Sequence, residues 1–164
     1  MKLLLTALGL ALILTAIAQA DPSTSPEYTA ADQAQFAKLG TANGKWTCAD
    51  TPPSKKPDVI TAKQLGNWYV WTESGDAPNT TFARWNATLR GYTEVEIDAD
   101  GSTEVYTTKS TDPFNATWKP GFPPGAKLYP YSVTTTGNTF KATGKYKDAK
   151  TGKVLTFKSI CTKS

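Results

Sequence analysis

Apolar and polar residues alternate along most of the chain after residue 45, and a period of two predicts half-buried β-strands. The segment 91–108 illustrates the pattern, because Val95 and Ile97 fall on one face and Glu94 and Glu96 on the other. An Asp-Gly pair in the middle of the segment predicts a hairpin turn. We therefore expect a hairpin with its aliphatic face inside and its glutamates exposed to solvent.

Other segments repeat this alternation and are predicted to be strands. They are 45–48, 67–74, 80–89, a hairpin over 129–148 that turns at Gly137-Asn138, and 153–163. Two segments rich in proline, 49–59 and 110–128, interrupt the series. Proline cannot donate to a strand ladder, so both segments are expected to be loops.

One helix is expected before the first strand. Thr29 can cap a helix, Asp32 stands at the capping-box position, and Gly40 suits the end. Phe36 and Leu39 lie three residues apart and would place one apolar stripe against the rest of the protein.

The first twenty residues have the pattern of a secretory signal peptide. Lys2 precedes an apolar run over 3–17, and an Ala-x-Ala cleavage site ends at Ala20. The alternative, an uncleaved membrane anchor, needs about 20 apolar residues. We therefore expect a signal peptide at 1–20, a flexible leader at 21–28 and one domain at 29–164. The location would be secreted or periplasmic, with no membrane insertion after cleavage.

The chain has two cysteines, Cys48 in the first predicted strand and Cys161 in the last. In an exported protein these are expected to form a disulfide, which requires the two strands to be neighbours. Strands at short spacing with one helix fit either a sandwich or an antiparallel barrel. A series of hairpins whose first and last strands meet is a closed barrel. The predicted fold is thus mainly β, a single up-and-down barrel with a short N-terminal helix and one disulfide.

The sequence resembles the lipocalin-like (calycin) superfamily, and within it small exported bacterial proteins. The resemblance rests on Leu39-Gly40 at the end of the helix, on Gly44, Trp46 and Cys48 in a Gly-x-Trp-x-Cys strand, and on Cys161. It implies that Trp46 and Gly44 are structural, with Trp46 at the closed end of the barrel beneath a basic side chain of the last strand. No arginine follows Arg90, so Lys158 would have to supply that side chain.

The resemblance also implies an internal cavity for a small apolar ligand. Trp71, Trp85 and Tyr131 are our candidates for its lining, with Arg84 or Arg90 as the anchor for a ligand carboxylate. Members of the group that bind haem do so through a histidine, and this chain has no histidine. We accordingly expect no cofactor.

Composition argues against several other functions. Without histidine, a Ser-His-Asp or Cys-His site and a histidine-bound metal are excluded. The net charge of +4 is small and the lysines are spread along the chain, which does not indicate a nucleic-acid partner. Glutamates 94, 96 and 104 are interpreted as solvated rather than as a catalytic pair, so we expect no enzyme and no metal site.

Two functions remain open. The first is a non-catalytic, exported protein that binds a small apolar ligand in its barrel. The alternative is an inhibitor-like interaction module with a filled barrel. Its protein partner would bind the proline-rich loops at 50–58 and 111–126, the latter with Phe114, Trp118 and Phe122 exposed.

Overall fold

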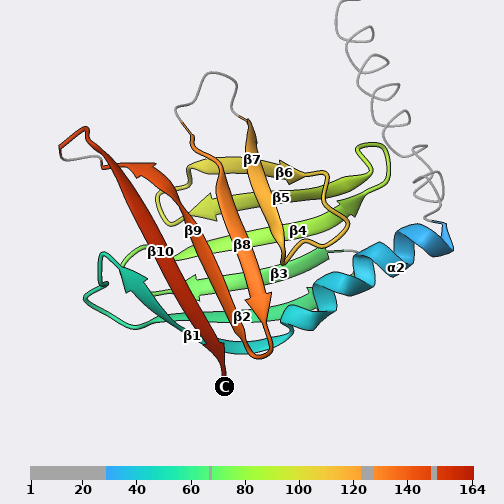
Figure 1. The fold of residues 1–164 in the computed structure, drawn as a ribbon, viewed down its shortest axis with the longest axis horizontal. Coiled ribbons are helices and arrows are strands. Elements are labelled where there is room, and N and C mark those ends of the chain that lie inside the picture. The colour runs from blue at the N-terminus through green and yellow to red at the C-terminus, as the bar shows by residue number, and fades with distance from the viewer. Residues whose placement is uncertain (1–28, 67, 123–127, 149–150) are drawn as a thin grey trace, which may run out of the picture.

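The computed structural model is a closed antiparallel barrel of ten strands with a short helix at one end (Figure 1). The elements are helix α2 (Ala30–Lys38), the 3-10 helix η2 (Leu39–Ala42), β1 (Gly44–Thr51), β2 (Asp58–Leu65), β3 (Trp68–Ser74), β4 (Asn79–Asn86), β5 (Gly91–Asp98), β6 (Thr103–Thr108), β7 (Ala116–Phe122), β8 (Tyr131–Thr136), β9 (Thr139–Lys147) and β10 (Val154–Lys163). The predicted fold class is confirmed.

The structure describes residues 29–66, 68–122, 128–148 and 151–164. The predicted signal peptide at 1–20 and leader at 21–28 lie outside the described residues, as does part of the proline-rich segment, 123–127.

Each strand pairs with the one before it, and the pairing of β1 with β10 closes the barrel. Cys48 lies directly opposite Cys161 in this ladder, with their Cα atoms 3.9 Å apart, and the two form the predicted disulfide. The first and last strands are therefore joined by hydrogen bonds and by a covalent bond across 113 residues of sequence.

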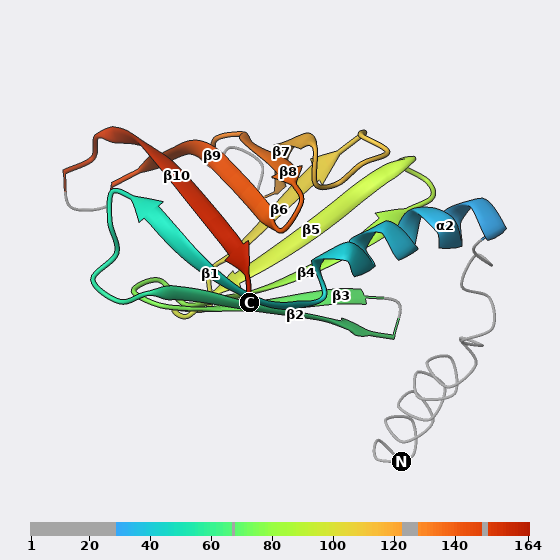
Figure 2. The same ribbon diagram turned by 60° about the horizontal axis from the view of Figure 1, so that its bottom comes forward.

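Helix α2 begins with the predicted capping box. The Thr29 hydroxyl accepts a hydrogen bond from the backbone N–H of Asp32, and the Asp32 carboxylate accepts one from the backbone N–H of Thr29. The chain continues through η2 into β1, so that Leu39 is fully buried at one end of the barrel. Figure 2 shows α2 at this end, beside β4 and extending beyond the barrel. Helix η2 and the buried Leu39 lie at this end, which we call the closed end of the barrel, and we call the opposite end the open end.

Two strands were not expected. β2 begins at Asp58, within the segment predicted to be a loop, and its residues 60–65 had no predicted element. β7 contains Pro120 and is paired on both sides, so the predicted loop at 111–126 is wrong over 116–122. The strand tolerates the proline because pairing with β8 covers only residues 116–118, and because the ladder with β6 shifts register beside Tyr106, the partner of Pro120.

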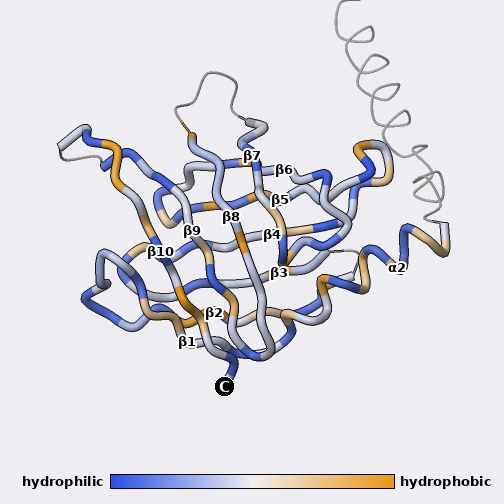
Figure 3. The backbone as a smooth tube through the Cα atoms, in the orientation of Figure 1, coloured by the Kyte–Doolittle hydropathy of each residue, from blue (hydrophilic) through white to orange (hydrophobic). Residues whose placement is uncertain are grey.

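The faces of the β5–β6 hairpin are the reverse of the prediction. Glu94 is 4% exposed and lies inside the barrel, whereas Ile97 on the other face is 39% exposed. Polar and apolar residues alternate along these strands, as the changing colours in Figure 3 show. Alternation specifies two faces but not which of them turns inward. Here Tyr92 and Tyr106, which share the glutamate face, are buried in the main core and decide the orientation.

The buried core has two parts. The larger gathers beneath the helix around Leu39, Tyr69, Trp85, Tyr92 and Trp118. The smaller surrounds the disulfide, where Trp46, Ile60 and Phe140 pack against the two cysteines. The space between and beyond these clusters forms the cavity.

Candidate ligand-binding cavity

A cavity of about 670 Å³ occupies the barrel interior. Its lining extends from Leu39 and Ala42, next to the helix, to Asp50 and Glu73, at the opposite end of the barrel. Sites for small molecules commonly have volumes of roughly 300–1,000 Å³. The aromatic part of the lining consists of Trp46, Trp71, Tyr106, Phe114, Trp118, Tyr129, Tyr131, Phe140, Tyr146 and Phe157.

Four glutamates form an acidic wall along this cavity: Glu73 on β3, Glu94 and Glu96 on β5, and Glu104 on β6. The strand register places them in successive rows. Glu96 lies directly opposite Glu104, and Glu94 lies one row deeper, opposite Tyr106. Among the four glutamates, Glu73 lies nearest the open end, since it is opposite Asn79, and Asn79 pairs with Asp98 beyond Glu96. Every second residue of β5 and β6 faces the cavity, so the carboxylates of these strands lie one after another along the cavity axis.

Three rings in contact form an aromatic wall beside it: Tyr106, Trp118 and Tyr131. The rings of Trp118 and Tyr131 are nearly parallel, with centroids 6.2 Å apart, and Tyr106 meets Tyr131 edge to face at 5.1 Å. The Tyr131 hydroxyl donates a hydrogen bond of 2.7 Å to Oε1 of Glu94. This bond joins β8 to β5, two strands that do not pair with each other, so it crosses the interior.

Burial raises the pKa of three of these carboxyl groups. The pKa of Glu94 rises to about 7, although the Tyr131 hydroxyl opposes the shift. The pKa of Glu96 rises to about 8, because burial is reinforced by the negative charges of Glu94, Asp98, Glu104 and Glu73. Burial likewise raises the pKa of Glu73 to about 7, with a further contribution from Asp58. Near neutral pH the acidic wall therefore holds part of its protons.

A second pair of carboxyl groups lies where β1 and β2 meet the open end. Ser54 donates a hydrogen bond to Asp58 at 2.8 Å and lies 3.1 Å from a carboxylate oxygen of Asp50. Burial and the neighbouring Asp50 raise the pKa of Asp58. Burial alone would also raise the pKa of Asp50, but hydrogen bonds from Asp58, Ser159 and Ser54 lower it. Asp50 is thus the more acidic member of the pair, and Asp58 keeps its proton to higher pH.

Trp46 lies at the closed end, beside Ala42, and a basic side chain of the last strand covers it. That side chain is Lys163, whose Nζ lies 5.4 Å from the ring centroid, and not Lys158. Trp46 itself donates a hydrogen bond to the Ala42 carbonyl at 2.8 Å. Gly44 leaves room for the lysine, because a Cβ at that position would lie 3.0 Å from Cε of Lys163. Glycine also accommodates the positive φ of 125° found there.

Two of the three predicted lining residues face the cavity, and neither of the two predicted anchors does. Trp71 and Tyr131 line it, but Trp85 and Arg84 do not. Trp85 is buried beneath the helix, where its indole N–H donates to Asp32 at 2.6 Å. Arg84 lies on the outer face of β4, over the ring of Trp68. The alternative anchor, Arg90, lies in the turn before β5 and is also absent from the lining.

The proline-rich segment does not display Trp118 and Phe114 as predicted. Trp118 is 2% exposed, and its indole N–H donates to the Pro113 carbonyl at 3.2 Å. Phe114 is half-buried and packs against the main core. The side chain of Phe122 is outside the described residues.

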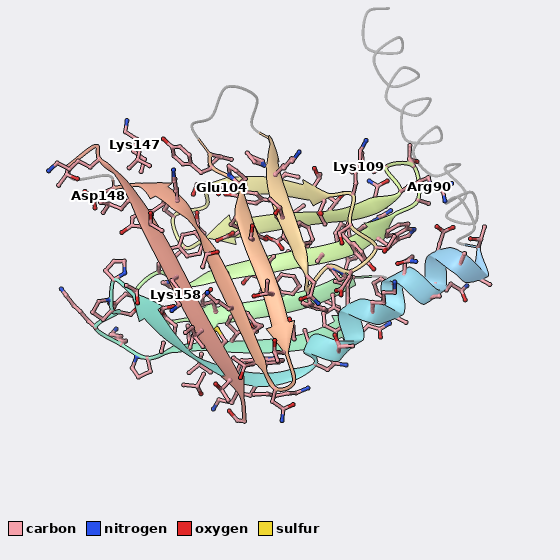
Figure 4. The ribbon with its side chains drawn as sticks, in the orientation of Figure 1. Arg90, Glu104, Lys109, Lys147, Asp148 and Lys158 are labelled. Atoms are coloured by element: carbon pink, nitrogen blue, oxygen red, sulfur yellow. A yellow bond between two sulfur atoms is a disulfide. The ribbon has the colours of Figure 1, made fainter. Side chains whose placement is uncertain are left out.

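Sequence reasoning missed the acidic wall. The sequence contains a signal for this wall in the positions of two tyrosines. Tyr92 lies on the same strand face as Glu94 and Glu96, and Tyr106 lies on the same face as Glu104. Large aromatic residues are stronger evidence for the inner face than aliphatic ones, and both tyrosines of this hairpin lie on the glutamate face, opposite to that of Val95, Ile97 and Val105. Glu104 on β6 and Lys158 on β10, both labelled in Figure 4, come from strands that are not neighbours in the barrel.

Three further findings bear on the site. Among residues 29–66, 68–122, 128–148 and 151–164, no group of three or more acidic or cysteine side chains is arranged to hold a metal ion. None of the helices in the described part of the chain has the length and apolarity that crossing a bilayer requires. No protein-family model matches this chain, and comparison with curated proteins finds no relative.

Proposed function

We propose that the protein binds a small, largely apolar ligand inside its barrel and is not a catalyst. The observation that carries the proposal is the cavity of about 670 Å³, lined by aromatic and aliphatic side chains with a few polar groups among them. This combination is typical of ligand sites. The burial of Trp118 argues against the alternative of a contact loop that displays this tryptophan.

A lipocalin-like mode of binding fits this proposal. A helix at one end, and Trp46 covered by Lys163, support the resemblance of the sequence. Lipocalin barrels have eight strands, however, and this barrel has ten. We therefore propose that the protein resembles lipocalins in binding a ligand inside a closed barrel, and we do not assign it to the lipocalins themselves.

Export to an oxidising compartment belongs to the same proposal. The disulfide is compatible with an extracellular or periplasmic location. Mass spectrometry of the protein from its native source would give the N-terminus. A mature chain that begins at Asp21 supports export with cleavage after Ala20.

Native mass spectrometry of the same material tests ligand binding. A reproducible adduct that is lost on denaturation is expected. A matched pair of variants on β9 would locate it. Ala142 lines the cavity, whereas the next residue, Thr143, lies on the outer face of the same strand. Ala142→Phe should abolish the adduct, and Thr143→Phe should leave it unchanged. An adduct that persists equally in both variants would place binding outside the barrel and contradict the proposal.

A further inference from the structure

The β5–β6 hairpin buries its acidic face and exposes its aliphatic one. Glu94 is 4% exposed, whereas Ile97 is 39% exposed. A buried carboxylate destabilises a fold unless it is paired or hydrogen-bonded. Exchange of the two faces would have buried aliphatic residues instead. Packing of Tyr92 and Tyr106 fixes which face turns inward, but it does not require carboxylates beside them, and this points to a role for the glutamates in binding.

The acidic wall has no cationic partner within the described residues. All the charges that act on Glu96 are negative, and they come from Glu94, Asp98, Glu104 and Glu73. Three lysines line the cavity, but they lie on β9 and β10: Lys145, Lys158 and Lys163. Of these, Lys163 is held over Trp46 at the closed end. The wall therefore presents a negative potential that the described side chains do not neutralise.

Hydrogen-bonding capacity is also left over. Glu94 is more than nine-tenths buried and lines the cavity, yet only its Oε1 receives a hydrogen bond, from Tyr131. Glu104 receives one from Tyr106 at 2.7 Å. Among the described residues, no donor reaches Glu96. Buried carboxylate oxygens normally accept several hydrogen bonds, so these oxygens can receive donors from a ligand.

We propose that the ligand is an organic cation, an inference that rests on the ligand-binding function proposed above. Its positive group lies between Glu94, Glu96 and Glu104. Its apolar part lies along the aromatic wall formed by Tyr106, Trp118 and Tyr131.

The arrangement suits an organic cation better than a metal ion or a neutral ligand. The described carboxylates are not gathered into a metal-binding group. Instead they alternate with tyrosines, as in the direct pairing of Glu94 with Tyr106. Aromatic rings attract ammonium and quaternary ammonium groups, and this attraction is stronger where water is excluded. A neutral apolar ligand would leave the buried carboxylates without partners.

Binding should release protons. The raised pKa values of Glu94 and Glu96 mean that the empty cavity keeps these carboxyl groups partly protonated near neutral pH. A cation favours their ionised forms and lowers both pKa values. Affinity should therefore rise with pH. The titratable groups that line the cavity are Asp50, Asp58, Glu73, Glu94, Glu96, Glu104, Tyr106, Tyr129, Tyr131, Lys145, Tyr146, Lys158 and Lys163, and the charge of Asp98 also acts on Glu96.

Two probes of equal shape test the inference by equilibrium dialysis against the purified protein. One is (2-naphthylmethyl)trimethylammonium, whose charge does not change with pH. The other is 2-neopentylnaphthalene, in which carbon replaces the nitrogen. At pH 8 the cation should bind at least about tenfold more tightly than its neutral isostere. Its affinity should fall at least about tenfold between pH 9 and pH 6, while that of the isostere should not change.

The double variant Glu94→Gln/Glu96→Gln should remove both the preference for the cation and its pH dependence. It is expected to fold, because glutamine still accepts the bond from Tyr131 and no charge is buried. Asp100→Asn is the matched control, since Asp100 lies exposed in the turn of the same hairpin and asparagine also suits an Asx-Gly turn. This variant should bind both probes like the wild type.

The outcomes separate this inference from the proposed function. If the neutral isostere binds as tightly as the cation, the cation inference is wrong and the ligand-binding function stands. A preference for the cation that survives in the double variant would show that other groups recognise it, and would also overturn the inference. If neither probe binds and native mass spectrometry shows no adduct, both proposals fail.

Discussion

Asp32 connects the start of the helix to the wall of the barrel through Trp85. Its Oδ2 accepts hydrogen bonds from the backbone and hydroxyl of Thr29, and its Oδ1 accepts the indole N–H of Trp85 at 2.6 Å. One carboxylate thus caps α2 and holds it to β4. These hydrogen bonds, from Thr29 first and then Trp85, lower the pKa of Asp32.

Because Asp32 has both roles, two variants of the same cap should lower the free energy of unfolding by different amounts. Thr29→Ala removes the capping hydroxyl and should lower the free energy of unfolding by about 1 kcal/mol. Asp32→Ala also removes the bond to Trp85 and should cost more. Urea denaturation of both variants measures the difference. Equal losses would mean that the bond between helix and barrel contributes nothing to stability.

The disulfide should contribute strongly because it closes a long loop. Cys48 and Cys161 are 113 residues apart in sequence. Removal of such a crosslink typically costs about 2–5 kcal/mol, since the unfolded chain gains conformational freedom. Urea denaturation of the Cys48→Ala/Cys161→Ala variant, compared with the oxidised wild type, should show a loss of this size. An unchanged midpoint would contradict it.

Gly91 should be intolerant of any side chain. A Cβ at Gly91 would collide with the backbone carbonyl oxygen of Thr108, on the neighbouring strand β6. Gly91→Ala is therefore expected to separate the two strands and to destabilise the fold by about 1–3 kcal/mol.

Gly121 on β7 provides the control for this substitution. A Cβ there would lie 3.6 Å from the nearest atom, the carbonyl oxygen of Val105, which is ordinary contact. Gly121→Ala should change the free energy of unfolding by less than about 0.5 kcal/mol. Thermal denaturation followed by circular dichroism compares the two variants, and a similar loss in both would refute the steric explanation.

The buried Glu94 predicts that stability falls as pH rises. Its pKa is about 7 in the folded protein against 4.5 for an ordinary glutamate, so between these values the folded state holds a proton that the unfolded chain has lost. Stability from this group is complete below about pH 4.5 and is lost as pH rises through about 7. The full effect is on the order of 3 kcal/mol.

Glu94→Gln keeps the acceptor for Tyr131 but removes the titration. The variant should be more stable than the wild type at pH 8 and should depend less on pH between 5 and 8. Urea denaturation at both pH values measures this. Parallel profiles for the two proteins would show that Glu94 does not carry the effect.

Local features were predictable from the sequence. The capping box depends only on Thr29 and Asp32, three residues apart, so its chemistry can be read directly. The disulfide was also predictable, because Cys48 and Cys161 had no other partners and the closure of the barrel followed from their pairing. In both cases the residues involved admit few alternatives.

Features that depend on how strands face one another were less predictable. Alternation in the β5–β6 hairpin is the same whether Glu94 faces inward or outward, and only packing of Tyr92 beneath the helix decides between them. The assignment of Trp85 and Arg84 to the cavity was wrong for a related reason. Alternation does not show which face of a strand turns inward or how far along the barrel a residue lies. Lys163 replaced Lys158 at Trp46 because contact depends on register, which places Trp46 directly opposite Lys163.

The disulfide-linked pairing of β1 with β10 also determines how the protein would respond to mechanical force. Tension applied at residues 29 and 164 passes along the chain only as far as Cys48 and Cys161, where it crosses the sulfur–sulfur bond. The strands between them carry no load. Stretching in an optical trap should therefore extend only the short terminal segments, and the full contour length should be released only after reduction. In its oxidised form the barrel, with its cavity, would remain intact under a pull that unravels an ordinary meander.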